Sequence, residues 1–214
     1  MTFAREGWPM AGGVAALSVA LGLAFGWAAT GIGLVAAFAV LLFFRDPNRN
    51  GTDDPRIVLA PADGRVVAVK RDAKPHRFDD KATTQISIFM SPLDVHINRM
   101  PLAATVVRVE HRKGSFRAAY AEEASEVNES NSLLLESESG LRLVVVQIAG
   151  WLARRIICHT SDGARLGRAE RFGLIMFGSR VDVFLPPNVE PLVAVGDRTR
   201  TAETPLARLE DCDV

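Results

Sequence analysis

The sequence predicts a mainly β protein, an antiparallel sandwich or partly open barrel, preceded by an N-terminal apolar helical hairpin. Two observations predict this fold class. The stretch between Glu6 and Arg45 holds no charged residue, which is typical of apolar helices. Beyond residue 50, short runs of β-branched or alternating residues end at turn residues, which is typical of antiparallel strands. We therefore divide the chain into a helical hairpin with its linker, residues 1–50, and a β domain, residues 51–214.

The uncharged N-terminal stretch is longer than one membrane span, because about 20 helical residues cross the hydrocarbon core. It suits two short apolar helices, residues 9–25 and 32–44, joined through residues 26–31. A spanning hairpin and a re-entrant or interfacial pair both fit these lengths. A cleaved signal peptide fits less well, since Arg5 is the single basic residue before the apolar part. The sequence thus predicts membrane attachment.

Arginines follow the second apolar helix. Arg45, Arg49 and Arg56 lie on this flank, and basic residues favour the cytoplasmic side of a membrane. A hairpin returns the chain to the side on which it began. The β domain is therefore expected at the cell membrane, on its cytoplasmic side.

The remainder of the chain alternates between short apolar runs and turn residues. Only residues 116–125 have a helical composition, and residues 75–81 suggest a polar loop. Strands are expected at residues 57–60, 65–70, 84–89, 105–111, 132–137, 141–149, 152–158, 173–177, 180–185, 192–195 and 206–209.

Two turn motifs, residues 61–67 and 195–207, indicate how these strands are arranged. Each opens a hairpin that resembles those of biotinyl and lipoyl carrier domains. Neither turn holds the lysine motif to which such groups are attached. We expect carrier-domain-like hairpins without a carrier function.

The bulk composition restricts the partners of the chain. Its 214 residues include 25 Lys and Arg and 25 Asp and Glu, so the formal net charge is zero. Nucleic-acid-binding proteins carry a basic excess, so no nucleic acid is expected as a partner. The two cysteines, Cys158 and Cys212, lie far apart and form no Cys/His cluster, so no metal site is expected.

The Gly178–Ser179 pair lies inside an apolar run, residues 171–186. A small polar dipeptide packs poorly in a strand. Gly178 has no Cβ, so its carbonyl can be approached closely, and the Ser179 hydroxyl lies beside that carbonyl. The pair permits an N-to-O acyl shift, after which elimination and hydrolysis leave a pyruvoyl group. A glycine bulge followed by a structural serine is the alternative.

Asp94 and His96 form a second polar cluster. Residues two apart project from the same face of an extended segment. The carboxylate would then orient the imidazole as a base that acts near neutral pH. A turn-capping aspartate and a histidine bonded to the backbone are the alternative.

Several blocks together resemble the phosphatidylserine decarboxylases, most closely their short form. The Phe-Gly-Ser-Arg-Val-Asp block is similar to the processing site of that family, and Ser-Pro-x-Asp-x-His…Met-Pro is similar to a second family block. The matching blocks lie at residues 43–47, 91–101, 128–131, 146–156 and 177–182.

This resemblance implies a chain that cuts itself between Gly178 and Ser179. The products would be a large β subunit, residues 1–178, and a small α subunit, residues 179–214, that stay together as a heterodimer; a homo-oligomer is an open alternative. Ser179 would become a covalent pyruvoyl group, which replaces pyridoxal phosphate and forms a Schiff base with the substrate. Phosphatidylserine in the membrane would be converted to phosphatidylethanolamine and CO₂.

The resemblance also implies roles for other residues. Asp94 matches the aspartate assigned to the self-cleavage relay, and His96 matches the histidine beside it. Arg154 and Arg155 would meet the substrate phosphate or carboxylate, or form a solvated strand end.

Asn128 and Glu129 would position polar groups at the site, or belong to an ordinary loop. Two other functions stay open: a membrane-anchored β-barrel binding or scaffold protein without self-processing, and a pyruvoyl decarboxylase that acts on a soluble amino acid.

Overall fold

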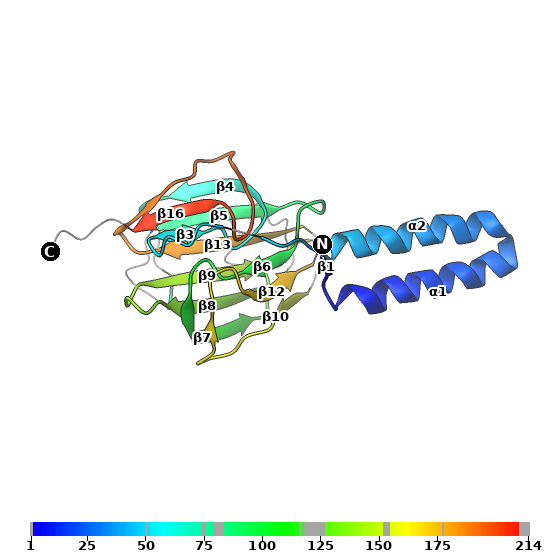
Figure 1. The fold of residues 1–214 in the computed structure, drawn as a ribbon, viewed down its shortest axis with the longest axis horizontal. Coiled ribbons are helices and arrows are strands. Elements are labelled where there is room, and N and C mark those ends of the chain that lie inside the picture. The colour runs from blue at the N-terminus through cyan, green and yellow to red at the C-terminus, as the bar shows by residue number, and fades with distance from the viewer. Residues whose placement is uncertain are drawn as a thin grey trace. The chain divides into compact units, whose positions relative to one another are not determined.

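The computed structural model describes residues 2–49, 51–73, 76–78, 84–115, 117, 127–151, 155–176 and 178–209. The chain forms two compact units, residues 1–48 and residues 49–214. The first unit is a helical hairpin and the second is built from β-strands (Figure 1).

The N-terminal unit is a pair of antiparallel helices closed by a short ribbon. Helix α1 is Gly7–Phe25 and helix α2 is Trp27–Phe43. Strands β1 (Thr2–Phe3) and β2 (Arg45–Asp46) pair at the base of the hairpin. The connection is shorter than the expected residues 26–31, because Gly26 alone makes the turn, with a positive φ of 96° that glycine adopts without strain.

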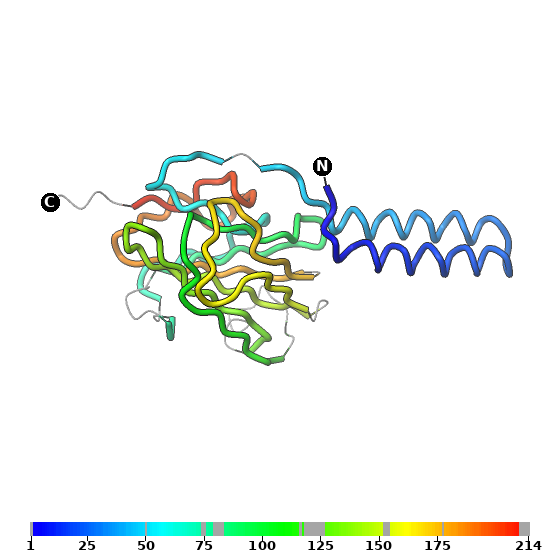
Figure 2. Tube along the Cα trace, turned by 60° about the horizontal axis from the view of Figure 1, so that its bottom comes forward, coloured from blue at the N-terminus to red at the C-terminus, as the bar shows by residue number. Residues whose placement is uncertain are grey.

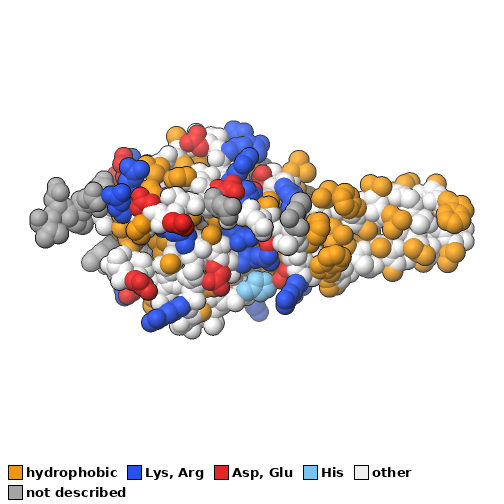
Figure 3. Space-filling view, in the orientation of Figure 1, with side chains coloured by type: hydrophobic (Ala, Val, Ile, Leu, Met, Phe, Trp, Pro, Cys, Tyr) orange, Lys and Arg blue, Asp and Glu red, His pale blue; other side chains and the backbone are white. Residues whose placement is uncertain are grey.

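Small residues form the interface between α1 and α2. A Cβ on Gly33 would collide with the Ser18 hydroxyl, and a Cβ on Gly22 would collide with the Thr30 hydroxyl. Such small residues let two helix backbones approach closely in a membrane. Most large apolar side chains of the hairpin, Trp27 among them, are exposed instead, and the visible face of the hairpin in Figure 3 is made of hydrophobic (orange) and other uncharged (white) atoms.

Helix α1 is long and apolar enough to cross a membrane, with 19 residues and a mean hydropathy of 1.6 in its best window. At 1.5 Å per residue it extends about 28 Å, close to the thickness of the hydrocarbon core. Helix α2 is apolar but two residues shorter.

The described strands of the second unit form three open, antiparallel sheets. The largest has the order β11-β7-β8-β9-β13-β5-β4-β15, and the two three-stranded sheets have the orders β10-β12-β6 and β14-β16-β3. The strands are β3 (Ile57–Leu59), β4 (Gly64–Lys70), β5 (Thr84–Met90), β6 (Ile97–Arg99), β7 (Ala104–Arg112), β8 (Ser130–Glu136), β9 (Arg142–Ile148), β10 (Ile156–Cys158), β11 (Arg165–Leu166), β12 (Arg171–Ile175), β13 (Ser179–Leu185), β14 (Val189–Pro191), β15 (Arg198–Thr199) and β16 (Pro205–Leu209).

The main hydrophobic core lies between the eight-stranded sheet and the two smaller ones, so the unit is a sandwich. Alternate residues of β13, from Val181 to Leu185, point into this core together with Val58 of β3 and Phe172 of β12. The opposite face of the large sheet carries a second apolar cluster that includes Phe184 and Ile148.

The prediction of a mainly β protein behind an apolar helical hairpin is confirmed. One expected strand, residues 192–195, is wrong. The strand there is β14, residues 189–191, and it ends because a turn follows. The Asp197 carboxylate accepts the Ala194 N–H at 2.8 Å, and the Asp197 N–H donates to the Ala194 carbonyl at 3.1 Å.

Three other expectations reach beyond the described residues. Of the expected helix at residues 116–125 only residue 117 is described, and of the expected loop at 75–81 only residues 76–78 are described. In the expected strand at 152–158, residues 152–154 lie outside the described part, and β10 occupies the rest.

The first turn motif opens a hairpin as expected, but the second does not, because its strands β15 and β16 pair with other strands and not with each other. Strand β4 forms a hairpin with β5, and β15 from the second motif pairs with β4 on its other edge. Strand β16, which closes the second motif, pairs with β3. The red C-terminal strand accordingly runs beside the cyan β3 in Figure 2.

Candidate functional site

Two crossings between sheets lie side by side in the β unit. The chain passes from β12 into β13 of the large sheet, and it makes the reverse passage from β5 into β6. Leu174 pairs with Ile97 on one side of these crossings, and Ser179 pairs with Met90 on the other. The fold therefore brings the segment from Ser91 to His96 beside the passage that carries Gly178 and Ser179.

A backbone hydrogen bond ties the two crossings together. The Ile175 N–H donates to the His96 carbonyl oxygen at 3.3 Å. His96 is buried, with 1% of its surface exposed. This bond and the strand register place the His96 backbone next to the segment that leads to the Gly178–Ser179 bond, which we call the junction.

Ser179 is the first residue of β13, and Gly178 directly precedes the strand. Ser179 is fully buried, and its hydroxyl donates to the Met90 sulfur at 3.5 Å. Gly178 has φ +67°, and a Cβ built on it would meet nothing within 4 Å. Glycine is therefore required here for its backbone conformation and not for space.

Asp94 and His96 differ in detail from the expected arrangement. The segment is a turn and not an extended strand: the Asp94 N–H donates to the Ser91 carbonyl at 2.9 Å, and the Asp94 carboxylate accepts the Ser91 N–H at 2.8 Å. The imidazole Nδ1 lies 2.9 Å from the main-chain oxygen of Asp94. The same-face argument from an extended backbone is thus wrong, because the chain must bend between two sheets.

The Asp94 carboxylate also faces a cation. Arg198 lies 3.8 Å from it and is largely exposed. Such an exposed pair contributes little to stability. It does place positive charge near the turn that precedes His96.

A chain of buried amides leads toward Ser179. Asn131 Nδ2 donates to Gln147 Oε1 at 3.0 Å, and Gln147 Nε2 donates to Asn98 Oδ1 at 2.9 Å. Asn98 Nδ2 lies 3.9 Å from the sulfur of Met90, which also accepts the Ser179 hydroxyl. All five side chains are at least 98% buried. We call Asn131, Gln147 and Asn98 the amide chain.

An ion pair occupies the opposite face of β13. Arg180 Nε donates to Asp182 Oδ1 at 2.7 Å, and its second nitrogen donates to Oδ2 at 2.9 Å. Gln85 Nε2 donates to the same carboxylate at 2.9 Å. The Arg180 and Asp182 side chains are 5% and 0% exposed, so the first charged residue after the junction is paired inside the protein.

Asn128 and Glu129 lie at the same end of the large sheet as Ser179. Asn128 is buried, and its Nδ2 donates to the carbonyl oxygens of Arg117 and Ala149, both at 2.8 Å. The Asn128 side chain thus holds backbone segments together. Glu129 Oε1 lies 3.3 Å from His111 Nε2.

Arg155 is exposed, and its carbonyl oxygen accepts the Met176 N–H at 3.1 Å. Its backbone therefore borders the passage into β13. Arg154, the other arginine singled out from the sequence, lies outside the described residues.

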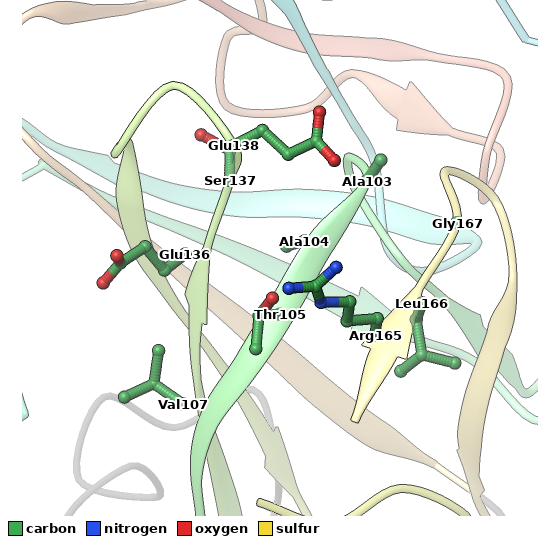
Figure 4. A pocket seen from close by; sticks show the side chains of 10 residues that line it. All are labelled: Ala103, Ala104, Thr105, Val107, Glu136, Ser137, Glu138, Arg165, Leu166 and Gly167. Carbon is green, nitrogen blue, oxygen red and sulfur yellow. The ribbon is translucent and has the colours of Figure 1, made fainter. Parts of the chain in front are cut away.

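A groove of about 450 Å³ lies at the other end of the large sheet (Figure 4). It is lined by the start of β7 and the end of β8, including Thr105 and Glu136, and by Arg165 of β11. Ser130, at the opposite end of β8, pairs with Ile148 beside the junction. The groove is therefore separate from the Ser179 site.

No group of three or more His, Cys, Asp or Glu side chains is placed to hold a metal ion within the described part of the chain.

Sequence reasoning gave no role to the amide chain or to the Arg180–Asp182 pair. A signal for both was present. Gln147 interrupts the apolar strand β9, and Arg180 and Asp182 alternate with valines in β13. Polar residues inside strands that are otherwise apolar are expected to be bonded to one another.

Comparison with known proteins places the chain in a family. The family model for phosphatidylserine decarboxylase matches residues 36–207. The phosphatidylserine decarboxylase proenzyme of Neisseria gonorrhoeae (strain NCCP11945) is 46% identical over 206 residues, which cover 96% of this chain and 78% of the relative.

Two further relatives carry the same name. The protein of Gluconacetobacter diazotrophicus is 49% identical over 185 residues, covering 86% of this chain and 82% of the relative. That of Pelobacter propionicus is 45% identical over 213 residues, covering 96% of both chains. With a family match over most of its length and relatives this similar, the chain belongs to the phosphatidylserine decarboxylase family.

Proposed function

We propose that this protein decarboxylates phosphatidylserine to phosphatidylethanolamine after it cuts itself between Gly178 and Ser179. The observation that supports the proposal is a fully buried serine, preceded by a glycine at φ +67°, in the passage whose Ile175 N–H donates to the His96 carbonyl oxygen. Family membership supplies the substrate, since the relatives are named phosphatidylserine decarboxylase proenzymes. The word proenzyme in these names agrees with a cut.

The cut uses atoms of the chain itself. Ser179 Oγ adds to the Gly178 carbonyl carbon, the C–N bond breaks, and an ester forms. Loss of the Ser179 α-proton then expels the Gly178 carboxylate, which ends the large fragment. The remaining enamine takes up a proton at Cβ and a water at Cα, releases ammonia, and leaves a pyruvoyl group at the start of residues 179–214.

Two of these steps need a base, first at Oγ and then at Cα. His96 is our candidate, because its backbone is bonded to Ile175, in the segment that leads to Gly178. Asp94 supports it by holding the turn from which His96 projects, through its carboxylate on the Ser91 N–H. These bonds in the turn fix the position of the imidazole relative to the Gly178–Ser179 bond.

The residues around Ser179 fit a pyruvoyl group. Ser179 is fully buried beside the apolar core and contacts a thioether, so a small methyl ketone fits its place. When formed, this group supplies an electron sink for the electrons that CO₂ leaves behind. The chain's own residues then exclude water from the site, and His96 delivers a proton to the substrate α-carbon.

Substrate contacts are assigned to groups that border the passage. Arg155 is exposed beside Met176, and its guanidinium suits a phosphate or a carboxylate. Arg154 is proposed for the same task. Asn128 holds the backbone at residues 117 and 149, and Glu129 shapes the same end of the sheet.

The two fragments stay together as a heterodimer after the cut. Strand β13 of the small fragment lies between β5 and β9 of the large one. Strand β16 of the small fragment pairs with β3. These ladder hydrogen bonds do not depend on the Gly178–Ser179 bond.

The helical hairpin brings the site to its lipid. Each buried CH₂ of an acyl chain contributes about 0.8 kcal/mol to membrane binding, so a two-chain phospholipid does not leave the bilayer readily. We place the hairpin in the cell membrane and the β unit on its cytoplasmic side, where Arg45 and Arg49 follow the second helix.

Mass spectrometry of the full chain purified in detergent tests the proposal. The wild type should give two fragments, and borohydride added with phosphatidylserine should increase the mass of the smaller one. Ser179→Ala should remain one full-length chain, whereas Ser130→Ala, a control at another buried serine, should be cut.

Two outcomes would favour the other functions. A wild-type chain that folds but stays uncut supports a membrane-anchored scaffold. A cut chain with equal activity toward free serine in the absence of vesicles supports a decarboxylase of soluble amino acids.

A further inference from the structure

The Ser179 hydroxyl donates its hydrogen bond to an unusual acceptor for a serine that is proposed to react. Its described hydrogen bond is to the sulfur of Met90, at 3.5 Å, across the β13–β5 pairing. A thioether is a weak acceptor and has no useful basicity. Met90 therefore orients the hydroxyl but does not take its proton.

The same position must serve two chemical states of residue 179. This point rests on the proposed function. Before the cut, Cβ carries a hydroxyl, which needs an acceptor because Ser179 is fully buried. After the cut, Cβ is the methyl of a pyruvoyl group, which needs an apolar neighbour. A carboxylate or amide at position 90 would satisfy the first state and be left without a donor in the second.

Methionine satisfies both requirements, because its thioether accepts a weak hydrogen bond and also packs as an apolar group. We infer that Met90 serves residue 179 in both of its chemical states: it holds the Ser179 hydroxyl only weakly before the cut, and it packs against the resulting methyl afterwards. The weak bond lets the hydroxyl turn to the base that removes its proton.

The amide chain fixes the sulfur in place. Asn98 Nδ2 lies 3.9 Å from the Met90 sulfur, and Asn98 is itself held by Gln147, which is held by Asn131. A methionine side chain is otherwise flexible, with three rotatable bonds. These bonds restrict the thioether to one position beside residue 179.

Acceptor strength at position 90 should therefore set the rate of the cut. Leucine accepts nothing, methionine accepts weakly, and the glutamine amide oxygen accepts strongly, while the three side chains have similar size. The inference predicts that Met90→Leu matures about two- to threefold faster than wild type and Met90→Gln about tenfold slower. If position 90 is important for packing alone, both variants should be slower than wild type.

The full chain would be made in a cell-free system with phospholipid vesicles, pulse-labelled, and followed for the appearance of the small fragment. Ile88→Leu and Ile88→Gln are the matched controls, because Ile88 is buried on the same face of β5. They should not reproduce the opposed effects of the two Met90 variants. The cut form of Met90→Gln should also unfold at a lower temperature than the cut form of Met90→Leu.

The order of the three rates decides the matter. The order Leu, Met, Gln from fastest to slowest supports the inference, and a wild type faster than both variants overturns it. If Met90→Gln does not fold, Met90→Leu alone decides, since acceleration supports the inference and slowing contradicts it. Absence of any cut in the wild type would instead refute the proposed function.

Discussion

The two faces of the eight-stranded sheet hold their buried polar groups in different ways. On the core face, the amide chain uses neutral groups that end at a thioether beside Ser179. On the opposite face, Arg180 and Asp182 form a paired, charge-assisted contact with help from Gln85. Neutral groups can change partners at low cost, whereas a buried ion pair cannot lose one member cheaply. Ser179 thus lies on the face whose buried polar groups are neutral, and the buried ion pair lies on the other face.

Removing one member of the ion pair should have the largest effect. Asp182→Ala leaves the Arg180 guanidinium buried without this carboxylate, and such a loss costs about 3–5 kcal/mol. We expect the midpoint of urea unfolding, followed by circular dichroism in detergent, to fall sharply. An unchanged midpoint would show that the ion pair on this face is no more costly to break than the neutral hydrogen bonds on the other face.

Replacing both members should restore most of that loss. Arg180→Met/Asp182→Leu removes both of these buried charges, and such replacements are often neutral or stabilising. Gln85 keeps a hydrogen bond to the Ser87 hydroxyl at 3.2 Å. The double variant should unfold within about 1 kcal/mol of wild type, and a loss as large as that of Asp182→Ala would show that the charges themselves are needed.

Interrupting the amide chain should cost less than breaking the ion pair. In Gln147→Leu, Asn98 Oδ1 loses its donor and Asn131 Nδ2 loses its acceptor. Leaving such neutral groups unsatisfied costs about 1–3 kcal/mol. Adding Asn131→Leu should be non-additive, because the two residues share a bond. Urea unfolding of both single variants and the double variant measures this coupling, and strict additivity would contradict it.

The effect that is smallest at neutral pH should appear as a pH dependence on the charged face. His76 packs against Phe184, its Nδ1 accepts the Phe78 N–H, and burial, with Arg77 and Arg112 nearby, lowers its pKa to about 4. The unfolded chain therefore binds this proton more readily between pH 6.5 and 4. The stability that His76 contributes is complete above pH 6.5 and decreases as the pH falls through this window.

His76→Asn removes this titration and offers an amide oxygen to the same N–H. The unfolding free energy of the variant should vary less between pH 6.5 and 4 than that of wild type. Equal slopes for the two proteins would show that the His76 pKa is not lowered by folding.

The sequence predicted the layers of the fold better than the geometry of the site. Uncharged helices and alternating strands follow from local pattern, so the hairpin and most strands were predicted within a few residues. The bend at Asp94 was not predictable from spacing, because it arises from the passage between two sheets. The partners of Gln147 and Met90 come from distant strands, and a single sequence carries no register between them.

The position of β13 in the middle of the large sheet has a further consequence for the life of the protein. In the uncut chain, β13 takes its place between β5 and β9, and β16 its place beside β3, within a single molecule. After the proposed cut, a denatured protein would have to reassemble from two separate chains, and its recovery would depend on concentration. The uncut precursor should renature at any dilution, so the proposed cut would convert reversible folding into stability that is maintained largely by slow unfolding.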